Sequence, residues 1–255
     1  MTESAPIHER LLKLAETDDT ITGAALTGSR ALDRADRWSD TDLVFAVQGD
    51  LTRTADRWTQ RCYDEFGALH HWDLPADDRI IRVFLLAGPE EIDITFAPED
   101  GFGPRGPQWR TLFGRERRLE PFAAPDSRTL TGLAWHHALH ARNSVERGNP
   151  WQAEYWISAL RGQVIALACL RAGLPTAHGK GAHLLPDELT TALAATLVRS
   201  PAEPELRRAL GASAAVLLEE LQRTDPAVAE RLRPVLTPLI EPQGTPVRRD
   251  FDDTP

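Results

Sequence analysis

Two short motifs within the first fifty residues constrain the fold of this chain most. The apolar run Ile21–Thr27 ends at Gly28-Ser29, and ten residues later Asp40-Thr41-Asp42 opens a second apolar run. Alternate side chains of a strand share a face, so a strand that begins here points Asp40 and Asp42 the same way. Two neighbouring carboxylates repel each other unless a cation lies between them, and such oxygen ligands suit magnesium. A Gly-Ser turn offers backbone N–H groups and a hydroxyl to a phosphate.

A third carboxylate lies in a later apolar run. The segment from Glu91 to Phe96 reads as the second strand of a hairpin that begins with Ile80–Leu86, because turn residues separate the two runs. In this strand Asp93 and Glu91 alternate with apolar residues and face away from the core. Asp93 can join the two earlier carboxylates if the strands are neighbours. Glu91, nearer the turn, is the competing candidate, and we expect it to face solvent.

The run from Gly28-Ser29 to Asp40-Thr41-Asp42 resembles the signature of the DNA polymerase β-like nucleotidyltransferase superfamily. Within that superfamily the chain looks most similar to the branch of aminoglycoside and lincosamide adenylyltransferases. The resemblance implies Mg²⁺-dependent transfer of AMP from ATP, the co-substrate, to a hydroxyl of a small molecule. An acidic turn between two strands is the competing explanation of the motif, and it leaves both the Gly-Ser turn and the later carboxylate as coincidences.

The resemblance also implies roles for individual residues. The triphosphate would contact Gly28, Ser29 and Arg30, and magnesium would be held by Asp40, Asp42 and Asp93. The last of these carboxylates could instead act as general base towards the acceptor hydroxyl.

The pattern of elements predicts an α+β fold with two domains and a tail. A mixed-sheet nucleotidyltransferase domain is expected over residues 1–120, a helical substrate-binding bundle over 121–241, and a mobile tail over 242–255. The expected helices of the first part are Ile7–Leu14, Arg30–Asp36 and Leu51–Phe66, and its expected strands include Asp42–Val47 and an edge strand, Ala68–Leu74. The helices expected in the second part are Ser127–Arg147, Pro150–Ala172, Asp187–Arg199, Pro204–Arg223 and Pro226–Leu239.

Two features of the second half are candidates for substrate contacts. Glu154, Ser158 and Arg161 form a polar stripe at helical spacing, which is usually a solvent face. The resemblance implies that this helix faces the cleft, with Glu154 contacting substrate amines or helping to deprotonate the hydroxyl and Arg161 reaching a phosphate. Lys180, between two glycines of a flexible loop, is a candidate for binding the β- or γ-phosphate, and a plain interhelical loop is the alternative.

Trp38 and Trp109 are candidates for ring stacking, although packing explains them better.

Composition limits the partners of the protein. The 255 residues carry a formal charge of −9, with no long basic stretch to neutralise a polynucleotide. No apolar run approaches the ~20 residues of a membrane span, and the first residues lack the pattern of a secretory signal. The two cysteines, Cys62 and Cys169, are expected as buried thiols in a reducing compartment, so the cytoplasm is the default. The expected partners are a nucleoside triphosphate and a small hydroxyl acceptor, without nucleic acid or membrane, and a homodimer is compatible with the family.

Three other functions remain open at this point. The enzyme could transfer AMP to protein or tRNA, as related enzymes of toxin–antitoxin systems do. It could be a nucleotide-binding regulator that has lost turnover, which the complete carboxylate set disfavours. The same chemistry could also serve small-molecule biosynthesis in place of antibiotic resistance.

Overall fold

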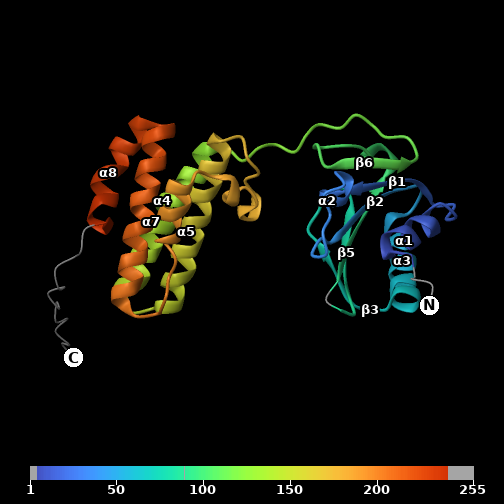
Figure 1. Ribbon diagram of the computed structural model, residues 1–255, viewed down its shortest axis with the longest axis horizontal. Coiled ribbons are helices and arrows are strands. Elements are labelled where there is room, and N and C mark those ends of the chain that lie inside the picture. Colours follow the sequence, from blue (N-terminus) through green and yellow to red (C-terminus); the bar gives the residue numbers. More distant parts are fainter. Residues whose placement is uncertain (1–4, 89, 241–255) are drawn as a thin grey trace, which may run out of the picture. The chain divides into compact units, whose positions relative to one another are not determined.

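The structure, a computed structural model, describes residues 5–88 and 90–240 of the chain (Figure 1). The expected tail over 242–255 and one residue of the expected hairpin turn, Pro89, lie outside the described residues. The chain divides into two compact units between Phe122 and Ala123. The first unit contains a six-stranded sheet and the second is helical, which confirms the predicted α+β fold class.

The sheet of the first unit has the strand order β3-β4-β5-β2-β1-β6. It is mixed, because β2 and β5 run parallel while the other neighbouring strands run antiparallel. The predicted hairpin of β4 with β5 and the predicted edge position of β3 are confirmed. The sixth strand was not predicted; it pairs with β1 at the opposite edge. The strands are β1 Ile21–Thr27, β2 Thr41–Val47, β3 Ala68–Leu74, β4 Ile80–Leu86, β5 Glu91–Pro98 and β6 Trp109–Phe113.

One face of the sheet is covered by α1 (Ile7–Ala15) and α3 (Leu51–Phe66) (Figure 1). The main core of this unit lies between these helices and the alternate strand residues that face them, which include Leu43, Phe45, Ile92, Ile94 and Phe96. The intervening residues face the other way. On that side Val44, Ala46 and Ala97 form a smaller cluster with Phe102. Asp42 and Asp93 belong to this second face, which we call the open face of the sheet.

The short helix after β1 differs from its prediction. Helix α2 spans Gly28–Ala31, so it begins and ends earlier than the predicted Arg30–Asp36. The chain turns out of helical geometry at Asp33, whose φ is +54°. Arg110 of β6 holds this residue with an ion pair of 2.7 Å between Nη1 and Oδ1. The left-handed residue that follows the end of the helix thus contacts the edge of the sheet; aspartate is among the residues that adopt this geometry most readily.

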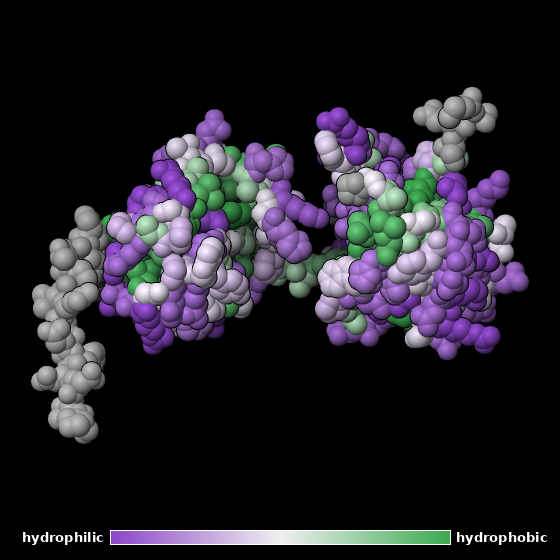
Figure 2. Space-filling view, turned by 90° about the horizontal axis from the view of Figure 1, so that it is seen from below, coloured by the Kyte–Doolittle hydropathy of each residue, from purple (hydrophilic) through white to green (hydrophobic). Residues whose placement is uncertain are grey.

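Up to residue 240, the second unit contains five α-helices, with a core rich in alanine and leucine between α4, α5 and α7. Four of the helices agree with their predicted bounds to within one residue, and α6 is shorter than predicted because the chain turns at Thr196, whose hydroxyl bonds to Leu193 O at 2.6 Å. None of the described helices is both long enough and apolar enough to cross a membrane. Apolar surface is visible on both units (Figure 2). The helices are α4 Ser127–Glu146, α5 Pro150–Arg171, α6 Asp187–Ala194, α7 Glu203–Thr224 and α8 Pro226–Ile240.

A buried carboxylate, Asp18, ties the turn after α1 to α3. Its side chain is 5% exposed and pairs with Arg57 at 2.9 Å. It also accepts hydrogen bonds from the backbone and hydroxyl of Thr20 and from Nε1 of Trp58. Burial opposes ionisation, but the hydrogen bonds from Thr20 and Arg57 outweigh it and hold the pKa of Asp18 below its ordinary value.

We expect Asp18→Asn to lower the free energy of unfolding by about 2 kcal/mol at pH 7, because charged hydrogen bonds are lost. A carboxyl whose pKa is lowered by folding stabilises the protein above its unfolded pKa of about 4, and this contribution is lost as pH falls through the folded pKa. The gap between variant and wild type should therefore narrow at acid pH. Urea unfolding at pH 7 and pH 3 measures this, and Asp19→Asn, at an exposed neighbour, is the control. A pH-independent gap would contradict the assignment.

Candidate active site

The parallel pairing of β2 with β5 places Asp42 in register with Asp93. Neighbouring strands lie about 4.8 Å apart, and paired residues project from the same face. Both side chains are half-buried on the open face. The structure therefore makes neighbours of two carboxylates that are far apart in sequence, as the alternation pattern predicts.

The turn at Gly28 lies directly against this carboxylate pair. Gly28 has a φ of +67°, and a Cβ atom built there would overlap Oδ2 of Asp42. Only glycine allows both the left-handed backbone and this close approach. Ser29 follows, half-buried, as the second residue of α2. The backbone of the Gly-Ser turn and the carboxylate of Asp42 are thus adjacent groups of one site.

Arg30 and Asp40 lie at the entrance of β2. Nε of Arg30 donates to the backbone oxygen of Asp40 at 3.0 Å, and Nη2 donates to Ser39 O at 3.3 Å. Asp40 itself is exposed and precedes the first residue of the strand. Within residues 5–88 and 90–240, no group of three or more His, Cys, Asp or Glu side chains is arranged to hold a metal ion. The structure thus brings together Asp42 and Asp93 but does not complete the expected set of three with Asp40.

The two adjacent carboxylates fit a magnesium ion that shares its coordination with a phosphate. Mg²⁺ is commonly held by one or two carboxylates together with substrate phosphates and water, not by an all-protein cage. The pair Asp42 and Asp93 supplies the carboxylates, and the backbone of the Gly28-Ser29 turn, which lies against Asp42, would supply N–H groups to the phosphate.

An apolar wall flanks the carboxylate pair. Asp93 is in register with Val83 of β4, and Val83 with Trp72 of β3. A single row of paired residues on the open face therefore runs from Trp72 to Asp42. Trp72 is 54% exposed, and Leu85, two residues from Val83 on the same face, is 45% exposed. Glu91 is exposed, as predicted, and pairs with Leu85.

Trp72 is the residue that sequence reasoning missed. The pairing of β3 with β4, not a local motif, brings it into the row of the carboxylates. Of the two tryptophans singled out from the sequence, Trp109 packs against Phe102 with ring centroids 5.2 Å apart. Trp38 is 79% exposed, and the guanidinium of Arg37 lies 4.5 Å from its ring.

The polar stripe of α5 forms a connected chain of hydrogen bonds in the second unit. Ser158 Oγ donates to Glu154 Oε1 at 2.6 Å, and Arg161 Nη2 donates to Ser158 Oγ at 2.8 Å. Arg161 Nη1 also donates to the backbone oxygen of Thr196 at 3.2 Å. Burial lowers the pKa of the Arg161 guanidinium. The stripe is half-buried, so it is not a plain solvent face.

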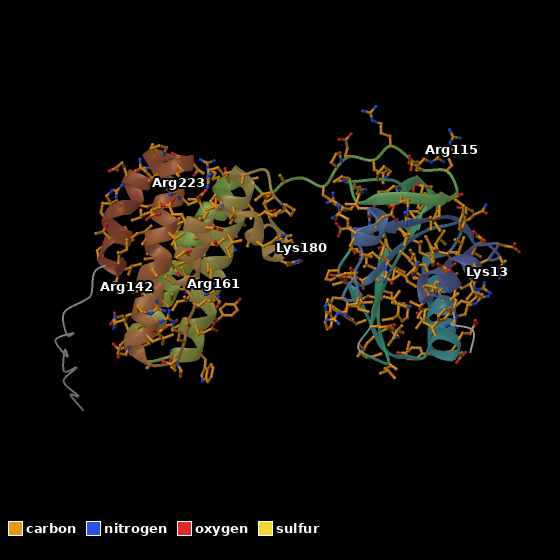
Figure 3. All side chains as sticks on the ribbon, viewed as in Figure 1. Lys13, Arg115, Arg142, Arg161, Lys180 and Arg223 are labelled. Carbon is orange, nitrogen blue, oxygen red and sulfur yellow. The ribbon has the colours of Figure 1, made fainter. Side chains whose placement is uncertain are left out.

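Lys180 is exposed on the second unit (Figure 3). Two 3₁₀ turns, Ala177–Gly179 and Ala182–Leu184, flank the lysine. The segment therefore has more regular structure than the predicted flexible loop. His178 has a φ of +52°, and Gly181 donates its N–H to Pro175 O at 3.1 Å. A side chain at Gly181 would collide with that same carbonyl. Close packing, not ligand approach, explains this second glycine.

No family model and no curated protein matches the chain. Among solved structures it is similar to an aminoglycoside 6-adenyltransferase from Bacillus subtilis, at 12% identity and a TM-score of 0.41 over 94% of this chain and 99% of that one. It is also similar to a nucleotidyltransferase-like protein from Exiguobacterium sibiricum, at 13% identity and a TM-score of 0.40 over 89% of this chain and 78% of that one. Likenesses this distant carry no functional assignment.

Proposed function

We propose that this protein is a nucleotidyltransferase that moves AMP from ATP to a hydroxyl of a small molecule. The observation that carries the proposal is the pair Asp42 and Asp93, set side by side on the open face with the Gly28 turn against it. Adjacent carboxylates next to a tight glycine turn suit a metal-bound triphosphate.

In the proposed reaction the acceptor oxygen forms a bond to the α-phosphorus of ATP, and the bond from that phosphorus to the β-phosphate oxygen breaks. Pyrophosphate leaves, and the hydroxyl proton goes to a base. Asp93, beside Asp42, is the side chain we assign as that base. Magnesium, held by Asp42 and Asp93, would stabilise negative charge on the transferred phosphoryl group.

The other residues position the reactants. Backbone N–H groups at Gly28 and Ser29 would orient the β- and γ-phosphates for in-line attack. Arg30 acts indirectly, because its guanidinium bonds to the backbone at Ser39 and Asp40 and so holds the entrance of β2.

The helical unit is proposed to supply acceptor contacts. The Glu154 carboxylate would bind amines of the acceptor. The Lys180 ammonium would bind the β- or γ-phosphate of the nucleotide. Arg161 is best assigned to holding the stripe in place, because both its terminal nitrogens already donate to neighbours within α5 and after α6.

Pyrophosphate release from ATP and Mg²⁺ tests the proposal, measured against a panel of aminoglycosides and lincosamides with product masses recorded. A mass gain of one AMP on one compound would establish the reaction and its acceptor class. A label from ATP on a copurified protein or RNA would replace the small molecule by a macromolecular acceptor. Failure to bind ATP in the presence of Mg²⁺ would refute the proposed site.

A further inference from the structure

We propose that a cavity within the helical unit is a separate binding site for a small organic anion that carries a flat apolar ring. The cavity has a volume of about 820 Å³, and its walls come from α4, α5, the end of α7 and the start of α8. This volume falls in the range of small-molecule sites, roughly 300–1,000 Å³. The inference concerns the second unit alone and does not rest on the proposed nucleotidyl transfer.

Three helices each present one stripe of side chains to the cavity. Helix α4 contributes Arg128, Gly132 and Trp135; α5 contributes Leu167, Leu170 and Arg171; and α8 contributes Val228, Arg231 and Leu232. Residues at such spacings of three, four and seven lie on one face of a helix. Each stripe combines an arginine with apolar or aromatic groups, and Arg223 at the end of α7 adds a fourth guanidinium (Figure 3).

The charges that line the cavity favour an anion. Four arginines line it against one carboxylate, Asp225, which is occupied in capping α8 through the N–H of Val228 at 3.0 Å. Guanidinium groups suit phosphate and carboxylate because they donate parallel hydrogen bonds. Such a concentration of cations contrasts with the net charge of −9 of the chain.

One buried carboxylate holds Arg171 in place without lining the cavity. Glu220 is fully buried and accepts from Nε and Nη2 of Arg171 at 2.6 and 3.1 Å. Within the described part of the chain, Nη1 of Arg171 makes no hydrogen bond. The Arg223 guanidinium lies farther from its carboxylates, 3.7 Å from Glu219 and 3.8 Å from Glu220. The site is therefore partly pre-organised, which lowers the cost of ordering it around a ligand.

The cavity also has room and a surface for a ring. Trp135 is 39% exposed and lines it, and its indole offers a flat face for stacking. One turn away on the same helix, Gly132 leaves open space, since a Cβ built there meets no atom within 4 Å. The combination of open space, an indole and guanidinium groups specifies an anion attached to a planar apolar body.

Isothermal titration calorimetry with 1-naphthyl phosphate tests this proposal on the full chain. We expect 1:1 binding that is tighter than that of inorganic phosphate or 1-naphthol alone. Gly132→Leu should place a branched side chain where the ring would lie and abolish binding, while leaving the melting temperature unchanged or higher because leucine favours helix over glycine. Gly162→Leu is the matched control: Gly162 is also helical, has no atom within 4 Å of a built Cβ, and lies outside the cavity. Unchanged affinity in Gly132→Leu would overturn the proposal.

A second pair of variants tests the charge. Arg231→Gln should weaken 1-naphthyl phosphate at least about fivefold while leaving 1-naphthol unaffected, because only the anion loses a charged partner. Arg233→Gln, on the same helix but outside the cavity, should leave both affinities unchanged. Equal losses in the two arginine variants would mean that general electrostatic attraction, and not this cavity, binds the probe.

Discussion

Asp42→Asn should abolish nucleotidyl transfer, lowering kcat/KM at least about a thousandfold, since a metal that stabilises transition-state charge supplies several kcal/mol. The amide keeps the size of the carboxylate but loses its charge and half of its acceptor capacity. Asp42 is only half-buried and lies near the start of β2, which pairs with a strand on either side. We therefore expect the fold to remain intact. Pyrophosphate release measures the loss, and circular dichroism with a melting curve verifies the fold.

Three companion variants make this result specific. Asp93→Asn should be comparably damaging, and the double variant should lose little more than either single one, because residues that act as a unit are not additive. Glu91→Gln, on the same face of β5 but exposed, should change kcat/KM by less than about twofold. If Asp42→Asn retained turnover within tenfold of wild type, or if Glu91→Gln were equally damaging, the assignment of the carboxylate pair would be wrong.

The pairing of these carboxylates shows what could be predicted from the sequence. Strict alternation in β5 places Ile92, Ile94 and Phe96 in the core and so forces Asp93 onto the open face. Strand β2 is apolar on both faces from Leu43 to Val47, so the face of Asp42 follows only from its position next to the core residue Leu43. Strand β6 was not predicted, because its five residues follow a glycine- and proline-rich stretch and only some of them are apolar. The bounds of α2 were not predicted because the chain leaves helical geometry at Asp33, a left-handed residue that the local sequence does not mark.

Features that depend on tertiary pairing could not be predicted at all. Spacing assigns residues to faces, but it does not say which faces meet. Trp72 joins the carboxylate row only through the pairing of β3 with β4 and of β4 with β5. Arg171 and Glu220 are 49 residues apart, and only helix packing makes them partners. Asp40 precedes the first residue of β2 and is exposed for that reason. The alternation of side chains does not say at which residue the strand begins.

Gly28→Ala should lower kcat/KM about a hundredfold or more, although it adds a single methyl group. The methyl carbon would overlap Oδ2 of Asp42, so either the turn or the carboxylate must move. A displacement of about 1 Å is enough to cost such a factor when reacting groups are held for in-line attack. The left-handed backbone adds a stability cost of about 1 kcal/mol for a residue with a Cβ.

Gly67→Ala separates these two effects. Gly67 ends α3 with a φ of +70°, close to that of Gly28, but a Cβ there meets no atom within 4 Å. We therefore expect the same loss of about 1 kcal/mol in the free energy of unfolding, with kcat/KM within twofold of wild type. Urea unfolding and pyrophosphate release on both variants give the comparison. If the two variants lost equal stability and equal activity, backbone strain alone would explain Gly28; if only Gly28→Ala lost activity, the contact between turn and carboxylate is what catalysis requires.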